Sequence, residues 1–210
     1  MRIGIIGAGM IGGSLAALFG ERGHEVLLSN SRGPHTLQGQ VAALPAAVRA
    51  ETVEDAARGG DVVVVAIPLY RFTDLPAEAF AGKIVVDAGN YYPSRDGVLP
   101  QLESGQTTSS EMVAGHLAGA RLVKAFNTIY FQNLRDDGRP DAPDEDRVAI
   151  PVAGDDAKAK GVVAELIREI GFAPVDAGSL AEGRRQEPGT PVYGQVVGPA
   201  EARDLLARAD

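Results

Sequence analysis

A strand-like run followed at once by a glycine-rich turn opens this chain. RIGIIG (2–7) is apolar like a buried strand, and MIGGSLAALFGERG (10–23) has the apolar spacing of a helix that ends at Gly23. Between them, the glycines of GAGMIG (7–12) have the spacing Gly-x-Gly-x-x-Gly. A fingerprint between a strand and a helix is typical of the first unit of a dinucleotide-binding domain. The sequence therefore predicts a parallel βαβ unit that binds a dinucleotide.

The remainder of the first half alternates short apolar runs with helical patterns. Strands are expected at 24–30, 48–51, 61–68, 83–90 and 121–128, and helices at 36–45, 52–60 and near 108–117. The runs at 61–68 and 83–90 are continuously apolar, as in strands that are covered on both faces. This alternation predicts an α/β fold with a doubly wound parallel sheet, the NAD(P)-binding Rossmann fold.

The composition changes after residue 128. The segment 133–146 is acidic and contains Pro and Gly, so we expect a solvated surface loop there. A further strand and helix follow at 147–154 and 156–171, where we expect Asp155 to cap the helix. A closing strand at 172–178 and a helix at 199–209 complete the pattern. We therefore divide the chain into a dinucleotide-binding Rossmann domain at 1–128 and a small C-terminal subdomain at 129–210.

Each position of the glycine fingerprint has its own expected role. Gly7 permits a tight turn, Gly9 lets the backbone approach a pyrophosphate, and Gly12 allows the helix to pack closely on the strand. The backbone N–H groups at the start of the helix, at Met10 and Ile11, face the phosphates and are assisted by the helix dipole. These five residues form the predicted phosphate site.

The end of the second predicted strand carries no acidic residue. An Asp or Glu about twenty positions beyond the fingerprint would bind the ribose hydroxyls of NAD. That position holds Asn30, Ser31 and Arg32, and the acid nearest to them, Glu25, lies at the opposite end of the strand. Arg32 can form paired, charge-assisted hydrogen bonds with a phosphate, and Ser31 adds a hydroxyl donor. The sequence therefore predicts NADP(H) as the cofactor.

The carboxyl ends of three predicted strands carry distinctive residues. These ends are AIP (66–68), the segment that reaches Asn90, and KAFNT (124–128). Ligands of open α/β sheets bind off the carboxyl ends of the strands, so a nicotinamide is expected to lie across them. Asn90 and Asn127 can hydrogen-bond its carboxamide or a second ligand, and each could instead cap a helix or turn.

The sequence offers no clear acid–base pair for carbonyl reduction. The three histidines fit the role poorly, because His24 lies at the opposite edge of the sheet, His35 near the adenosine end and His116 at the close of a helix. Lys124 is expected to be a solvated charge at a strand end, and Tyr91 and Tyr92 lack the lysine of a Tyr-x-x-x-Lys pair. Hydride transfer between two ring cofactors requires only close alignment of the rings. We therefore expect such a transfer, with no catalytic side chain assigned.

Composition excludes several other classes of function. The net charge of −8 argues against nucleic acid or an anionic membrane as a partner, because both require clustered cations. The chain has no cysteine, which excludes disulfides and thiolate metal sites, and we predict no metal site. No secretory signal pattern and no membrane-spanning apolar stretch is found. A soluble cytoplasmic protein is the expectation.

A family resemblance rests on segments spread from residue 1 to about 193. GIIGAGMIGGSLA, NSRGP, VVVVAIP, GKIVVDAGNYYPSRDG, VKAFNT, VAGDDAKAK and GFAPVDAG together resemble the F420-dependent NADP oxidoreductase family. KAFNT with AGDD and VDAG is more specific to this family than the fingerprint is. Members exchange a hydride between NADP(H) and the deazaflavin coenzyme F420, so the resemblance implies this activity and both cofactors.

The resemblance also implies roles for individual residues. The family's phosphate glycines match Gly7, Gly9 and Gly12, its 2′-phosphate clamp matches Ser31 and Arg32, its nicotinamide loop matches Ala66, Ile67 and Pro68, and its second-cofactor pocket matches Phe126, Asn127 and Thr128. The C-terminal part is expected to cover that pocket. Better-known members of the family have a residue that looks more like a histidine where this chain has Asn127. The tail of this chain after Val192 also departs from the helical C-terminus that the family pattern implies. Members of the family are homodimers, so the resemblance implies a homodimer for this chain.

Three alternatives to the F420 reaction remain open. The chain could be an NADPH-dependent reductase of a flavin or of ferric ion on the same scaffold. It could be a non-catalytic NADP(H) sensor. It could also reduce an imine or hydroxy acid with Tyr91, Tyr92 or Lys124. Arg184 and Arg185 could meet the anionic tail of a second cofactor, or lie on the surface as ordinary arginines.

Overall fold

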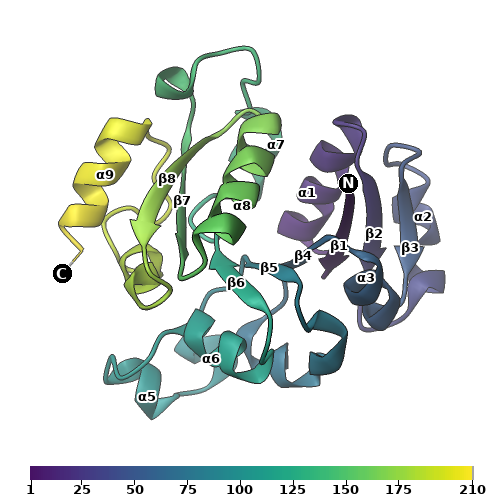
Figure 1. The fold of residues 1–210 in the computed structure, drawn as a ribbon, viewed down its shortest axis with the longest axis horizontal. Coiled ribbons are helices and arrows are strands. Elements are labelled where there is room, and N and C mark those ends of the chain that lie inside the picture. The colour runs from purple at the N-terminus through teal and green to yellow at the C-terminus, as the bar shows by residue number, and fades with distance from the viewer. Residues whose placement is uncertain (210) are drawn as a thin grey trace.

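The computed structural model describes residues 1–209, which form one eight-stranded sheet (Figure 1). The strands are β1 (Arg2–Ile6), β2 (Glu25–Ser29), β3 (Val48–Glu51), β4 (Val62–Val65), β5 (Ile84–Asp87), β6 (Arg121–Lys124), β7 (Ala149–Gly154) and β8 (Ala173–Gly178). Their order across the sheet is β3-β2-β1-β4-β5-β6-β7-β8. Every neighbouring pair is parallel except β6 with β7, which is antiparallel. The expected parallel sheet is thus present with one reversal.

Helices connect most of the strands. They are α1 (Met10–Glu21), α2 (Gln38–Val41), α3 (Val53–Gly59), α4 (Pro93–Asp96), α5 (Pro100–Glu103), α6 (Ser109–His116), α7 (Phe131–Asp136), α8 (Ala157–Glu169) and α9 (Pro199–Ala207). Short 3₁₀ helices lie at Pro34–Leu37, Leu69–Asp74, Ala77–Phe80, Asp144–Asp146 and Ala181–Gln186. Thr52 caps α3, because its hydroxyl accepts from the Asp55 N–H.

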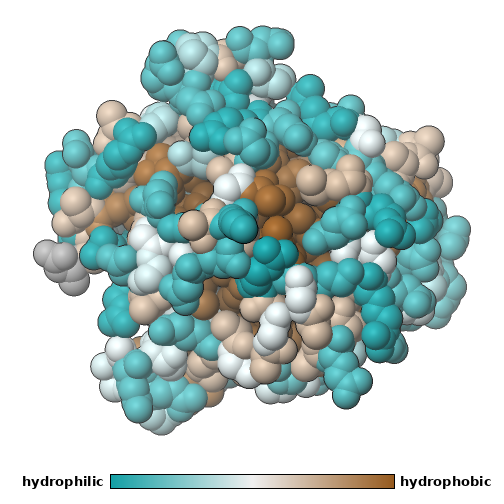
Figure 2. All heavy atoms as spheres, viewed as in Figure 1, coloured by the Kyte–Doolittle hydropathy of each residue, from teal (hydrophilic) through white to brown (hydrophobic). Residues whose placement is uncertain are grey.

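Two hydrophobic cores enclose the sheet, one on each face. Leu15 and Phe19 of α1 and Val163 of α8 belong to the first core. Ala56 of α3 and Val113 of α6 belong to the second. Strand β4 is buried along its whole length because its alternate valines face opposite cores. Figure 2 shows apolar residues gathered in the middle of the face seen in Figure 1, between α1 and α8. This arrangement confirms the doubly wound α/β fold.

The order of the strands determines where a ligand can bind. The chain runs outward from β1 to β3 and then returns to β4 on the other side of β1. The helices that follow β1 and β4 consequently leave a crevice between the carboxyl ends of these two strands. The register places Val65 of β4 and Ser29 of β2 on either side of Ile6. The loops that follow β1, β2 and β4 therefore begin next to one another at the carboxyl edge of the sheet.

The C-terminal part extends the same sheet. β7 and β8 add to it beyond residue 128, and α9 packs against β8 through Ala202 and Leu206. The segment at 133–146 is not purely a solvated loop, because α7 overlaps its start and buries Leu134. The prediction that Asp155 caps α8 is wrong. Asp156 caps it, accepting from the Lys158 and Ala159 N–H groups, while Asp155 accepts from the Leu180 N–H.

Within residues 1–209, no helix combines the length and apolarity needed to cross a bilayer.

Candidate functional site

The glycine turn is packed as a phosphate-binding turn requires. Gly7 has a φ of +110°, and a Cβ there would lie 2.3 Å from the Ala66 carbonyl oxygen. A Cβ on Gly12 would lie 1.8 Å from the Gly7 carbonyl oxygen, so only glycine lets α1 approach β1 this closely. A Cβ on Gly9 would meet nothing within 4 Å. The backbone at Gly9 is therefore open to a ligand.

The N-terminus of α1 faces that open side and carries no competing group. No side chain caps it, and its first turn contains no acidic residue. Backbone N–H groups at a helix start bind anions, and the helix dipole adds to the attraction. Gly7 and Gly9 of this turn, together with Asn30 and Ser31 directly after β2, line a cavity of about 960 Å³. The structure therefore fits a pyrophosphate at Gly9 and an adenosine half beyond it.

The loop after β2 forms one wall of this first cavity. Asn30 and Ser31 line it, and Asn30 Oδ1 accepts from the Arg32 N–H at 2.9 Å. The Arg32 side chain is exposed and does not line the cavity. Glu25 forms an ion pair with Arg49, away from the cavity. No acid of β2 thus competes with a 2′-phosphate.

A further cation, Arg71, lies at this cavity. Arg71 lines it from the 3₁₀ helix after β4 and forms a 2.5 Å ion pair with Asp74. The cavity therefore has Arg71 on its wall, paired with Asp74, whereas Arg32 only follows the lining residue Ser31 in the chain. Arg71 lies in a segment without strand or fingerprint spacing, and no local motif points to it.

A second cavity, of about 430 Å³, meets the first at the glycine turn. Gly9 and Ala66–Pro68 line both cavities. The second cavity is also lined by Met10, Ile11, Ala88, Gly89, Asn90, Tyr92, Arg95, Phe126, Asn127, Ile129, Tyr130, Phe131 and Tyr193. Of the predicted second-cofactor residues, Thr128 is not part of this lining. It is buried, and its carbonyl accepts from the Gly194 N–H at 2.9 Å.

The two asparagines at this cavity bind each other. Asn127 Nδ2 donates to Asn90 Oδ1 at 3.0 Å and to the Gln186 carbonyl at 2.6 Å. Asn127 Oδ1 accepts from Gln186 Nε2 at 2.9 Å. Asn90 Nδ2 donates to the Asn127 carbonyl at 2.9 Å. Both amide protons of Asn127 are consequently engaged within the protein, and this side chain fixes the chain tail at Gln186 to the end of β6.

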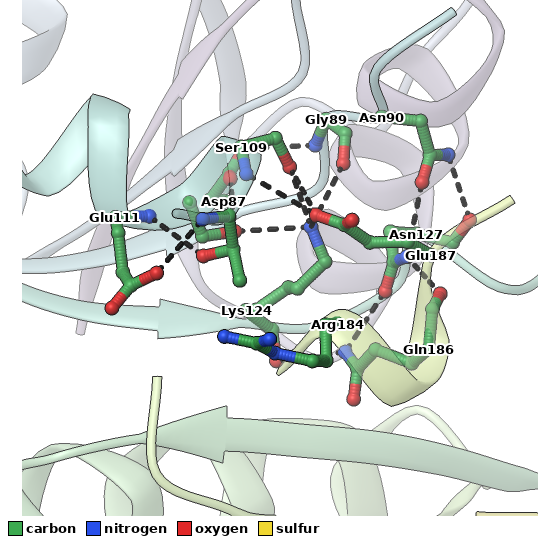
Figure 3. A network of polar contacts seen from close by, with 12 residues as sticks. Asp87, Gly89, Asn90, Ser109, Glu111, Lys124, Asn127, Arg184, Gln186 and Glu187 are labelled. Carbon is green, nitrogen blue, oxygen red and sulfur yellow. Dashed lines mark hydrogen bonds and ion pairs between the residues drawn. The ribbon is translucent and has the colours of Figure 1, made fainter. Parts of the chain in front are cut away.

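Lys124 lies behind the cavity wall, in the polar network of Figure 3. Its side chain is fully buried, so the expectation of a solvated charge is wrong. Lys124 Nζ donates to Ser110 Oγ at 3.0 Å and to Ser109 Oγ at 3.2 Å. Ser110 Oγ donates to Asp87, and Ser109 Oγ donates to Glu187, each at 2.7 Å. Each serine thus connects the ammonium to a carboxylate.

Tyr193 and Arg95 are site residues that sequence reasoning missed. Tyr193 comes from the tail and shares a hydrogen bond with Tyr92, at the second cavity. Burial raises the pKa of the Tyr193 hydroxyl, and its hydrogen bond to Tyr92 adds to the shift. Arg95 lies over the Tyr92 ring, 4.8 Å from its centroid. No spacing in the sequence connects the tail with the loop after β5.

The other candidates for proton transfer lie outside both cavities. The Tyr91 hydroxyl donates to the Gly97 carbonyl and accepts from the Leu99 N–H. His24 forms a hydrogen bond with Glu169, and His116 forms one with the Leu75 carbonyl.

Arg185 forms an ion pair with Glu182 at 3.0 Å. Within residues 1–209, no group of three or more His, Asp or Glu side chains is arranged to hold a metal ion.

Comparison with known proteins identifies relatives over most of the chain. Residues 2–91 match the family described as NADP oxidoreductase coenzyme F420-dependent. The solved structure of the hypothetical protein SMa0349 from Sinorhizobium meliloti is 35% identical, with a TM-score of 0.80, and the match covers 94% of this chain and 95% of that one. A candidate F420-dependent NADP reductase from Arthrobacter sp. FB24 is 29% identical, with a TM-score of 0.74, over 88% of this chain and 87% of that one.

Curated relatives include reductases of a different kind. Rat (Rattus norvegicus) metalloreductase STEAP3 is 31% identical over 89% of this chain, and the match covers 36% of the rat protein. The human STEAP2 metalloreductase is 27% identical, with 35% of its length covered. This chain thus spans about a third of the length of the curated relatives that it matches.

Proposed function

This chain belongs to the F420-dependent NADP oxidoreductase family, and we propose that it transfers a hydride between NADP(H) and the deazaflavin coenzyme F420. The observation that carries the proposal is the meeting of two cavities at Gly9 and Ala66–Pro68. The first suits an adenosine diphosphate half, and the second suits a nicotinamide with a further ring. Two rings in contact at this junction are what a direct hydride transfer requires.

We assign the dinucleotide to the turn and to the loop after β2. Gly7, Gly9 and Gly12 shape the turn, and the N–H groups of Met10 and Ile11 are directed to the phosphates. The loop with Asn30, Ser31 and Arg32 binds the 2′-phosphate of NADP(H), supported by the absence of a carboxylate from residues 30–32. The carboxylates that line the cavity, Glu54 and Asp74, come from α3 and from the 3₁₀ helix after β4. Ala66, Ile67 and Pro68 pack against the nicotinamide, and Phe126 and Asn127 form the wall behind it. Thr128 supports that wall through the hydrogen bond that its carbonyl accepts from the Gly194 N–H.

A flavin in place of F420 is the second candidate, because the cavity offers the same walls to either ring. Ferric ion suits the cavity less well. Arg95 is the only charged residue in its lining within residues 1–209, and cations are repelled by such a site. The metalloreductase relatives are much longer proteins, so the metal reduction in their name does not carry over to this chain by similarity alone.

A cofactor screen tests the proposal. Purified protein is mixed with NADPH and with F420, FMN or a ferric chelate, and the absorbance of each acceptor is followed. We expect turnover with F420 and saturable binding of NADPH in a separate titration. Turnover with FMN or the ferric chelate alone would favour the reductase alternatives. NADPH binding without transfer to any acceptor would contradict the enzymatic proposal and favour a sensor.

A further inference from the structure

The second cavity contains a hydroxyl proton that no protein group accepts. The hydroxyls of Tyr92 and Tyr193 share one hydrogen bond, and Asn90 Nδ2 donates to the Tyr193 oxygen at 3.5 Å. Each tyrosine supplies one proton, and their mutual bond uses only one of the two. Within residues 1–209, neither hydroxyl has a further acceptor. One O–H of the pair is therefore available to a ligand.

Arg95 is held beside this pair by several contacts. Its guanidinium stacks on the Tyr92 ring, and Arg95 Nη2 donates to the Asn90 carbonyl at 2.7 Å. Both oxygens of Asp96 also accept from Arg95 at 2.9 Å, and the Asp96 side chain is fully buried. These contacts involve Nε and Nη2, which leaves Nη1 without a protein partner in residues 1–209. Arg95 is thus a fixed donor next to the hydroxyls.

The remaining walls of the cavity are largely apolar. Ala88, Phe126, Ile129 and Phe131 line it, and no carboxylate does so within residues 1–209. The amide protons of Asn127 are already engaged. The Tyr92–Tyr193 pair and Nη1 of Arg95 therefore offer donors that the described residues leave unused. A flat ring with carbonyl oxygens on one edge satisfies both the apolar walls and these donors.

We propose that the Tyr92–Tyr193 hydroxyl pair, with Arg95 beside it, binds the carbonyl edge of the hydride acceptor and stabilises the negative charge that develops there. The inference deepens the proposed function and rests on it. In the reaction, the C4–H bond of NADPH breaks, its hydride bonds to the acceptor ring, and NADP⁺ is left. The acceptor gains two electrons, and water supplies the one proton that completes its reduction.

The hydroxyls act as hydrogen-bond donors in this reaction, not as acids. Burial keeps the pKa of Tyr193 above its usual value, so the hydroxyl retains its proton at neutral pH. A donor aimed at developing charge in a site with apolar walls lowers the barrier without giving up its proton. This role differs from that of a general acid because no reprotonation of the tyrosine is required between turnovers.

The decisive test is the double variant Tyr92→Phe/Tyr193→Phe. It removes both hydroxyls and keeps both rings, so that neither residue can replace the other. We expect the Kd for oxidised F420, measured by fluorescence, to rise at least about fivefold. We expect hydride transfer in a single turnover to slow by about 10²-fold. The Kd for NADPH should change less than about twofold, because its adenosine and phosphate groups are bound in the first cavity, which is untouched, and both aromatic rings of the second cavity are kept. Each single variant should lose less F420 affinity and less of the hydride-transfer rate than the double variant, since one hydroxyl donor remains.

Tyr91→Phe is the matched control. It makes the same chemical change in the adjacent residue, whose hydroxyl binds the backbone outside both cavities. Equal losses in Tyr91→Phe and Tyr92→Phe would overturn the inference, as would unchanged F420 binding and transfer in the double variant. A parallel loss of NADPH binding would also overturn it. The same losses measured with FMN would support it, because both rings share the carbonyl edge.

The inference and the proposed function can fail separately. Binding of oxidised F420 or FMN is measured without NADPH, so it does not depend on turnover. If the wild type binds a ring and the double variant does not, the site is supported even where no hydride is transferred. If the wild type binds neither ring, the site is refuted whatever NADPH does.

Discussion

The Nζ atom of Lys124 lies 3.7 Å from Oε1 of Glu187, and the Lys124 side chain has no exposed surface. The pair joins the end of β6 to the tail that carries Tyr193. The ammonium also donates to the Gly89 carbonyl and to the hydroxyls of Ser109 and Ser110. These hydroxyls in turn donate to Glu187 and Asp87. Removal of the cation would leave two carboxylates without a positive partner, of which Asp87 is buried.

Lys124→Met is therefore expected to lower the free energy of unfolding by about 3 kcal/mol. Urea denaturation measures the change. Lys158→Met is the control, because Lys158 is exposed at the start of α8. The free energy of unfolding of this variant should stay within about 0.5 kcal/mol of the wild-type value. In a Glu187→Gln background, Lys124→Met should cost less, since one unpaired charge is gone. Equal costs in both backgrounds would contradict the proposed coupling.

Arg32→Glu is expected to raise the Kd for NADPH at least about tenfold and to leave the Kd for NADH nearly unchanged. The reason is that only NADPH carries the 2′-phosphate that the introduced carboxylate repels. Titration with each nucleotide measures both constants. Arg22→Glu makes the same charge change at an exposed position after α1, away from the cavity, and serves as the control. An NADPH affinity that survives in Arg32→Glu would refute the clamp.

Gly12→Ala is expected to lower stability by about 1–3 kcal/mol and to weaken NADPH binding. The added methyl group would lie 1.8 Å from the Gly7 carbonyl oxygen, so α1 and the turn must move apart. Gly161→Ala is the matched control, because its Cβ would meet nothing within 4 Å in α8. That change should raise stability by about 0.5–1 kcal/mol, since alanine favours the helix. A stable Gly12→Ala variant that binds NADPH normally would contradict the close approach.

Hydride transfer is expected to show no alkaline loss from Tyr193 below about pH 10. The pKa of this hydroxyl is raised by burial, so the protonated donor persists beyond the usual range of tyrosine. Its contribution to the unfolding free energy is likewise complete below about pH 10 and is lost as the pH rises above that value. Single-turnover rates from pH 6 to 10 test this. An alkaline limb centred below about pH 9 that vanishes in Tyr193→Phe would contradict it.

Much of the fold could be predicted because its signals are local. The strand at 48–51 follows from the alternation of apolar and charged residues in VRAE, and the cap at Thr52 from a capping residue directly before a helix. The error at Asp155 has a local origin too. Two adjacent aspartates offer the same cap, and the contact of Asp155 with Leu180 decides between them. The boundary at residue 128 remains a prediction, although the sheet continues across it.

The candidate site divides in the same way. The glycine turn and the missing acid after β2 predict the dinucleotide from neighbouring residues alone. The second cavity depends on distant ones, since Tyr92 and Tyr193 are 101 positions apart. Lys124 has the composition of an exposed strand end, and only the serines of α6 and Glu187 of the tail make its burial favourable.

The sequence by itself determined the α/β fold and the phosphate turn, because hydrophobic period and glycine spacing act over short stretches of chain. The tertiary structure alone decided that Lys124 is buried, that Asn127 is bound by the tail, and that Tyr193 lines the second cavity. These outcomes depend on the burial and pairing of polar groups brought together by folding, and no short segment specifies such partners.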